Sequence, residues 1–240
     1  MVSMPDPAPR TKSWQTATVV AITPENARTK TYRLALTEPA PHQAGQHCVV
    51  RLTAPDGYRA QRSYSIASAP DATNEFEITV ERLEGGEVST FLHDEVAVGD
   101  ELEIRTPIGG WFVWDGTSPA LLVGGGSGVV PLMAMLRLAR RTDRADLLRL
   151  VVSVRTPAYL YYADEIAGPQ TTLVYTRAAP PSFARAPGRL TLADIPQPVA
   201  PATRGFVCGS SGFADAAGDV LVAVGIPTEQ IRVERFGPSG

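Results

Sequence analysis

The sequence predicts two domains, a small antiparallel β-barrel followed by a doubly wound α/β domain with a parallel sheet. Three observations predict this order. The first half is a series of short β-rich segments separated by turns, the second half alternates strand and helix patterns, and a glycine-rich turn at 124–128 joins the first such strand to its helix. We place the barrel at 13–115 and the α/β domain at 116–240, after a flexible, Pro-rich N-terminus at 1–12.

Six segments of the first half are rich in β-branched or alternating apolar residues, as strands are. They are Trp14–Ile22, Thr31–Leu36, Gln46–Leu52, Arg62–Ala67, Phe76–Arg82 and Glu101–Arg105. Turn sequences such as Pro55-Asp56-Gly57 and Gly85-Gly86 separate them, and Ser89–Glu95 predicts one short helix. Strands at this spacing favour a small antiparallel barrel.

The second half opens with a continuous apolar run, Ala120–Val123, which predicts a buried strand, and a helix is expected over Val130–Arg140. The remaining elements are predicted strands at Leu148–Val154, Thr172–Tyr175, Gly205–Cys208 and Gln230–Phe236, with a helix at Phe213–Val224. Strands that alternate with helices predict a parallel sheet covered on both faces.

Composition is that of an ordinary globular protein, with 44% hydrophobic residues, 20% charged residues and a net charge of -3, which does not indicate a nucleic-acid binder. Residues 1–115 carry 10 basic against 16 acidic side chains, and residues 116–240 carry 12 against 9. This asymmetry suits two domains with different ligands, and equally an uneven solvated surface. Two cysteines, Cys48 and Cys208, are too few for a disulfide framework, a zinc site or an iron–sulfur cluster, so no metal is expected.

Thr117–Leu136 is uncharged and about as long as a membrane span. The glycines at 124–126 and 128, followed by Pro131, would break a helix there, so strand, turn and helix is the better interpretation. The N-terminus lacks the apolar segment of a secretory signal. We therefore expect a cytoplasmic protein, a monomer with no membrane partner.

The turn Gly126-Ser127-Gly128-Val129-Val130-Pro131 follows a buried strand and opens a helix. Glycines let backbone N–H groups approach a pyrophosphate, and the helix N-terminus favours an anion. Pro131 suits a first helical turn, but it stands where G-x-G-x-x-G would have its third glycine. The pattern predicts a dinucleotide site, with a purely structural turn as the alternative.

An acidic residue at the end of the next strand would indicate NAD, and Val152-Ser153-Val154-Arg155-Thr156 has none. Hydroxyls and arginines stand at these strand ends and beyond: Ser153, Arg155, Thr176, Arg177, Arg185 and Arg189. Such groups suit the 2′-phosphate of NADPH, so NADPH is favoured over NADH. The alternative is that they are ordinary solvated side chains.

Arg62-Ser63-Tyr64-Ser65 places an arginine and an aromatic ring on one face of a strand, where they could bind a phosphate and cover a flat heterocycle. Gly85–Leu92 combines glycines, hydroxyls and a helix start, which predicts a second anion site around Gly86 and Ser89. Ser89 could equally be a plain N-cap.

In this order, the motifs resemble the ferredoxin–NADP⁺ reductase family over Ser13–Phe236. Arg62–Ser65 is similar to its flavin signature R-x-Y-S. The resemblance implies that Arg62 binds the FAD pyrophosphate, Tyr64 packs on the isoalloxazine ring, and Ser65 reaches flavin N5. It also implies FAD contacts from the strand Thr79-Val80-Glu81-Arg82 and the helix start Val88-Ser89-Thr90.

Further along, Pro107–Phe112 resembles the P-x-G-x-F closure of the barrel with one inserted position, and Gly126–Pro131 resembles the G-[TS]-G-x-x-P nicotinamide turn. Val207-Cys208-Gly209-Ser210 resembles the segment whose thiol lies against the nicotinamide ring. Glu234-Arg235-Phe236 resembles the C-terminal acid–x–aromatic, in which the aromatic shields the flavin. Here Phe236 replaces a tyrosine of plastid members, and four more residues follow it.

The resemblance implies an NAD(P)H-dependent, FAD-containing reductase in which Ser65, Cys208, Glu234 and Phe236 act at the site of hydride transfer. Because the sequence has no cluster cysteines and no haem-binding extension, we expect electrons to leave singly to a separate acceptor protein, with ferredoxin as the first candidate. Two alternatives stay open. One is a flavin reductase acting on free flavin, and the other is a non-catalytic, redox-sensing electron-transfer subunit.

Overall fold

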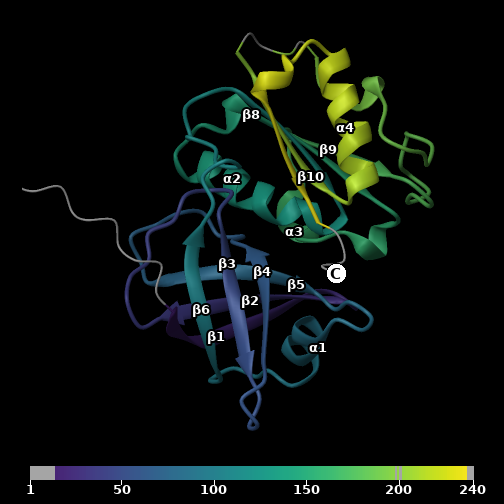
Figure 1. Ribbon diagram of the computed structural model, residues 1–240. Coiled ribbons are helices and arrows are strands. Elements are labelled where there is room, and N and C mark those ends of the chain that lie inside the picture. Colours follow the sequence, from purple (N-terminus) through teal and green to yellow (C-terminus); the bar gives the residue numbers. More distant parts are fainter. Residues whose placement is uncertain (1–13, 198, 200–201, 237–240) are drawn as a thin grey trace, which may run out of the picture.

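The computed structural model describes residues 14–197, 199 and 202–236, so the expected flexible segment 1–12 lies outside the described residues. An antiparallel sheet of six strands and a parallel sheet of five strands form the two halves of the molecule, stacked one above the other (Figure 1). The predicted fold class, a barrel followed by an α/β domain, is confirmed.

The barrel strands are β1 (Trp14–Asn26), β2 (Thr29–Leu36), β3 (His47–Thr53), β4 (Arg59–Ser65), β5 (Glu75–Glu81) and β6 (Glu101–Ile108). Their order is β4-β3-β6-β1-β2-β5, and a bridge between Ile66 and Ile78 closes the sheet. The strand β1 runs past its predicted end because pairing with β2 continues through a bulge to Asn26. The short helix α1 (Glu87–Asp94) follows β5.

The alternation of β5 divides its side chains between two environments. Phe76, Ile78 and Val80 point into the barrel core, where all three are buried. Thr79 and Glu81 point the other way, toward the second domain, where each accepts a hydrogen bond from a tyrosine of that domain. This outer face of β5 is therefore part of the domain interface.

The parallel strands are β7 (Ala120–Gly125), β8 (Leu148–Val154), β9 (Thr171–Tyr175), β10 (Arg204–Gly209) and β11 (Ile231–Arg235), in the order β11-β10-β7-β8-β9. The helix α2 (Val129–Arg141) covers one face and α4 (Ser211–Ala223) the other (Figure 1). Successive residues follow this division, since Leu122 packs in the α2 cluster and Leu121 in the α4 cluster. Every predicted helix and strand is present, with ends that differ by a few residues.

Between the two sheets, one apolar cluster contains residues from both halves. Phe112 meets Phe206 edge to face at 5.4 Å between ring centroids, and Trp114 is buried beside them. In the connection that follows, Asp115 accepts hydrogen bonds from the backbone N–H groups of Thr117 and Ser118. A small helix, α3 (Ala163–Ile166), packs above β5.

Candidate functional site

A cavity of about 310 Å³ lies between the two domains. Its wall combines residues of both, and most of the sequence-predicted flavin residues are among them. The lining residues are Arg62, Ser63, Tyr64, Ser65, Thr79, Glu81, Leu83, Glu84, Gly85, Gly86, Val88, Ser89, Ser127, Val130 and Phe236.

The barrel side of the cavity begins with the outer residues of β4. Arg62 and Tyr64 lie opposite Val50 and Cys48 on β3, on one face of the strand as their spacing predicts. Arg62 donates to the carbonyl of Gln61 at 2.7 Å, and no carboxylate of the described residues forms an ion pair with it. A guanidinium without a counter-ion at a cavity wall is a fit for a phosphate. Tyr64 is partly buried, and this burial raises its pKa.

The loop 83–86 and the start of α1 form the next part of the wall. Gly85 adopts a left-handed φ of +71°, a turn conformation that favours glycine. The N-cap of α1 is Gly86, so the alternative that Ser89 is the N-cap is wrong. Instead, the Ser89 hydroxyl accepts a hydrogen bond from Leu83 N–H and donates one to the Gly86 carbonyl, which ties the loop to the helix. Thr90 lines an adjoining open groove on the other side of α1.

On β5, Thr79 and Glu81 face the cavity, whereas the side chain of Val80 lies wholly in the barrel core. Val80 can therefore reach a ligand only through its backbone. Tyr162 of α3's N-terminus donates its phenol proton to Thr79 at 2.6 Å, and Tyr161 donates to Glu81 at 2.9 Å.

The glycine turn forms the opposite wall, where Ser127 and Val130 line the cavity. A Cβ on Gly128 would stand 2.1 Å from the Cys208 carbonyl oxygen, and one on Gly125 would stand 2.6 Å from the Phe213 ring. These two glycines are required by packing. Gly126 has a φ of +55° and faces open space, so close packing does not account for it, and a ligand could approach there.

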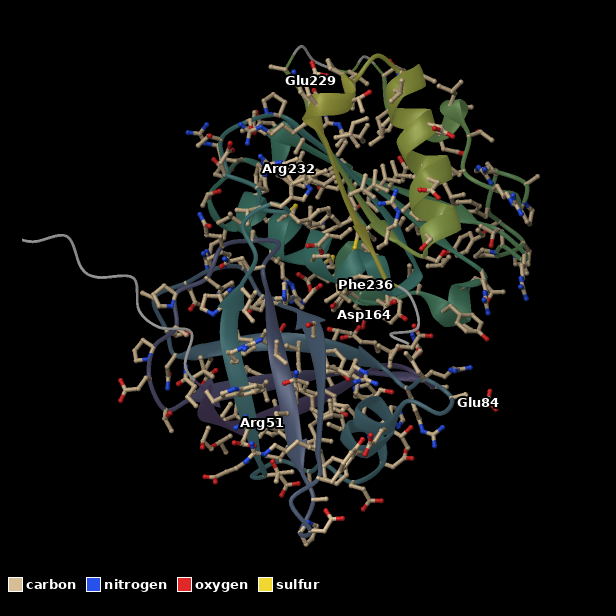
Figure 2. The ribbon with its side chains drawn as sticks, in the orientation of Figure 1. Arg51, Glu84, Asp164, Glu229, Arg232 and Phe236 are labelled. Atoms are coloured by element: carbon tan, nitrogen blue, oxygen red, sulfur yellow. The ribbon has the colours of Figure 1, made fainter. Side chains whose placement is uncertain are left out.

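Cys208 and Glu234 are neighbours on the parallel strands β10 and β11. The thiol is fully buried, and burial together with the Glu234 carboxylate raises its pKa well above the ordinary value. Burial raises the pKa of Glu234 to about 7. Phe236 follows β11, donates its N–H to the Gly209 carbonyl at 2.9 Å, and lines the cavity at the junction of the two domains (Figure 2).

The arginines expected to bind a 2′-phosphate differ in whether their guanidinium groups already pair with a carboxylate. Arg155 and Arg177 stand at the neighbouring ends of β8 and β9, where Arg177 N–H donates to the Arg155 carbonyl at 2.9 Å. Both are exposed, and neither forms an ion pair with a described residue. Arg185 differs, because its guanidinium pairs with Asp194 and also donates to the Arg189 carbonyl at 2.8 Å. Ser153 and Thr176 lie at the same strand ends, and Gly209 and Ser210 lead into α4.

No group of three or more potential metal-ligating side chains occurs in the part of the chain that the structure describes. Among the same residues, no helix is both long and apolar enough to cross a membrane. Sequence reasoning did not assign Leu83, Glu84 or Val130 to the site. Their place in the cavity wall follows from how the 83–86 loop folds over and how α2 is docked, which no local motif indicates.

Residues 16–113 match the family model of the oxidoreductase FAD-binding domain. The whole fold is similar to a ferredoxin NADP⁺ reductase from Neisseria gonorrhoeae with bound FAD and NADP, with a TM-score of 0.79, 21% identity, and coverage of 94% of this chain and 99% of that one. The chain therefore carries an oxidoreductase FAD-binding domain, and its fold is that of a ferredoxin–NADP⁺ reductase. The residues that match the FAD-binding model are those of the barrel and the connection that follows it.

Similar sequences also occur in longer reductase proteins. A flavohemoprotein from Pseudomonas putida is 33% identical over 206 residues, which are 82% of this chain and 52% of that protein. The reductase component of a propane 2-monooxygenase from Mycolicibacterium smegmatis is 28% identical over 233 residues, 91% of this chain and 66% of that protein. The chain thus spans about half to two thirds of the length of these relatives.

Proposed function

We propose that this reductase-family chain takes a hydride from NADPH onto FAD and passes electrons singly to a separate acceptor protein. The observation that carries the proposal is the cavity between the domains. It brings the flavin motif of β4, the start of α1, the glycine turn and Phe236 to one place. Folding alone does not require segments so far apart in sequence to surround one cavity. A flavin bound next to a nucleotide, in contrast, would contact each of these segments.

The residues present fit FAD. Arg62 has no carboxylate partner in the described chain and would bind the pyrophosphate, together with backbone N–H groups at the start of α1 and the Ser89 loop. Tyr64 would cover the ring system, Ser63 and the backbone of Val88 would complete the phosphate end, and Ser65 would lie at the reacting edge. Thr90 does not line this cavity and could meet only a part of FAD that extends into the adjoining groove. Bound FAD would supply what side chains lack, the capacity to accept a hydride and release electrons one at a time.

The protein's own part in this reaction is positioning and exclusion of water. Cys208 is buried at the end of β10 and stays a neutral thiol, because its pKa is raised. Glu234 lies beside it and can hold a proton near neutral pH. Phe236, at 38% exposed, lines the cavity and in this proposal would move aside for a nicotinamide ring to enter.

The nucleotide would bind with its pyrophosphate at Gly126, Ser127 and Gly128, ahead of Pro131. Arg155 and Arg177, with Ser153 and Thr176, would bind the 2′-phosphate that distinguishes NADPH from NADH. Arg185 keeps its place in the loop through Asp194 and would shape this site without being free to bind the phosphate. Gly209 and Ser210 would border the nicotinamide end.

A separate acceptor is supported by relatives that are named as reductase components, such as that of propane 2-monooxygenase. The 240 residues contain two cysteines, and both are buried, so they hold no four-cysteine cluster of their own. A ferredoxin is the first acceptor to test. A structural neighbour from Amycolatopsis, with 28% identity and a TM-score of 0.78, is the cytochrome P450 reductase GcoB, whose name indicates a P450 as its acceptor.

The proposal is tested by purifying the protein, measuring bound FAD, and recording flavin reduction by NADPH and by NADH in a stopped-flow instrument. We expect tightly held FAD and faster reduction by NADPH. Arg155→Ala with Arg177→Ala should remove that preference while leaving the rate with NADH unchanged. FAD that exchanges freely during turnover would instead indicate a flavin reductase. Failure to oxidise NADPH with ferricyanide would indicate a non-catalytic subunit.

Arg62→Ala should lose most bound FAD, because a charge-assisted contact to the pyrophosphate is worth about 1.5–3 kcal/mol. Arg59→Ala is the matched control, since Arg59 is an exposed arginine on the same strand that does not line the cavity. Equal FAD content in the two variants would contradict the assignment of Arg62.

A further inference from the structure

Four residues form a closed ring of hydrogen bonds behind the cavity wall, to which Tyr162 contributes both its hydroxyl and its backbone N–H. The Glu25 carboxylate, at the end of β1, accepts from Thr31 Oγ1 at 2.7 Å and from the backbone N–H of Tyr162 at 2.7 Å. Thr31 Oγ1 lies 2.8 Å from Thr79 Oγ1, and the Tyr162 hydroxyl lies 2.6 Å from the same Thr79 oxygen. Thr31, Thr79 and Tyr162 are buried.

The direction of every bond in this ring is fixed by counting protons. A carboxylate only accepts, so the single hydroxyl proton of Thr31 is used on Glu25. Thr31 then has no proton for Thr79, and the bond between the two threonines is donated by Thr79. With its own proton used, Thr79 must accept from Tyr162, whose phenol is the donor.

Thr79 is also the member of the ring that lines the cavity. Its oxygen has one acceptor position left and no proton to offer. A ligand edge that meets it must therefore supply an N–H or O–H donor, because a carbonyl oxygen there would face an oxygen lone pair. The oxidised isoalloxazine ring has both kinds of edge group, carbonyl oxygens and an N–H.

We infer that Glu25, acting through Thr31, makes Thr79 an acceptor-only group that selects the N–H edge of the flavin ring. Tyr162, from the nucleotide domain, contributes by donating its phenol proton to the same Thr79 oxygen. The inference rests on the proposed function, since it requires FAD in this cavity. Glu25 is a positioning residue, because it does not line the cavity itself. The left-handed backbone of Tyr162, with a φ of +53°, is held by the bond from its N–H to Glu25.

Glu25→Gln tests the direction of the hydrogen bonds in the ring, because glutamine has nearly the same shape as glutamate but can also donate. The amide oxygen of glutamine must face the Tyr162 N–H, so its NH₂ group faces Thr31 and donates to it. This releases the proton of Thr31 toward Thr79 and the proton of Thr79 toward the cavity. The hydroxyl at the cavity wall changes from acceptor to donor, although no cavity residue has been changed.

The measurement is the dissociation constant of FAD from the full-length apoprotein, with the visible spectrum of the bound flavin as a second readout. We expect Glu25→Gln and Thr79→Val each to weaken FAD binding about three- to tenfold, and Thr79→Ser to bind like the wild type. The double variant Glu25→Gln with Thr79→Val should match Thr79→Val alone, because Glu25 acts only through Thr79.

Glu103→Gln is the matched control, since Glu103 also accepts a hydrogen bond from a barrel threonine, Thr53, at 3.0 Å and lies outside the cavity. It should leave the FAD dissociation constant and spectrum unchanged. An unchanged dissociation constant in Glu25→Gln, or a double variant weakened by the product of the two single effects, would overturn the inference. Wild-type apoprotein that binds no FAD would refute the proposed function instead, so the two failures are distinguishable.

Discussion

At the scale of single residues, burial decides the chemistry at the end of the parallel sheet. Cys208 and Glu234 share a register position on neighbouring strands, and both have a raised pKa because water is kept from them. A buried thiol of this kind is uncharged and inert toward oxidation. The carboxyl group of Glu234 can change its charge near neutral pH, whereas an exposed glutamate cannot.

Glu234→Gln should therefore change how stability depends on pH. The folded-state pKa of Glu234, about 7, exceeds its ordinary value of 4.5, so the folded protein binds the extra proton between these limits. Stability consequently falls as pH rises from about 4.5 to 7, and the buried charge costs about 1–2 kcal/mol above that range. Glutamine removes this cost.

Urea unfolding of the nucleotide-free protein at pH 5 and at pH 8 measures the effect. The wild type should lose more stability than Glu234→Gln between the two pH values, and the variant should be the more stable at pH 8. Asp215→Asn, which changes an exposed carboxylate, should behave as the wild type does. Equal pH dependence in wild type and Glu234→Gln would show that Glu234 is not held in its neutral form.

At the scale of elements, the turn between β7 and α2 serves packing and, in the proposed function, also binds the nucleotide. Gly128 stands so close to the Cys208 carbonyl that β10 and the start of α2 are in backbone contact. The sequence predicted this strand, turn and helix correctly, because a buried apolar run followed by glycines is a strong local pattern. It left open which glycine served packing, since that depends on strand β10, about 80 residues later.

Gly128→Ala should displace the start of α2, because its Cβ would stand 2.1 Å from a backbone oxygen that cannot move alone. We expect a loss of several kcal/mol in stability and weaker nucleotide binding, measured by urea unfolding and by titration with NADP⁺. Gly218→Ala in the middle of α4 is the control. It meets nothing within 4 Å, and alanine should stabilise the helix by about 0.5–1 kcal/mol. A tolerated Gly128→Ala would contradict the close packing of these elements.

At the scale of the whole molecule, the two domains are joined by polar contacts as well as by the shared core. Arg137 of α2 donates to Glu77 of the barrel at 2.7 Å and to Glu165 of α3 at 2.6 Å. Its guanidinium also lies 5.1 Å from the Tyr162 ring centroid. These carboxylates keep the pKa of Arg137 above its ordinary value in spite of burial. The orientation of β5 toward the nucleotide domain is thus fixed from both sides.

Arg137→Met should cost about 2–3 kcal/mol, because it leaves two partly buried carboxylates without their partner. Tryptophan fluorescence and circular dichroism during urea unfolding measure the loss. In the wild type the two signals should change together, since Phe112 and Trp114 tie both domains into one core. Arg33→Met breaks an exposed pair with Glu75 and should cost below about 1 kcal/mol. Equal losses in the two variants would argue against an interdomain role for Arg137.

The sequence by itself determined the element order, the fold class and the flavin motif, because strand alternation, apolar runs and glycine turns are set by neighbouring residues. It also placed Arg62, Tyr64 and Ser127, which lie in the cavity wall as local motifs indicate. Only the tertiary structure decided that Arg185 is paired with Asp194, and that Glu25, Thr31, Thr79 and Tyr162 form one ring. Such pairings join residues up to 137 positions apart, and burial and hydrogen-bond direction exist only once those segments have met.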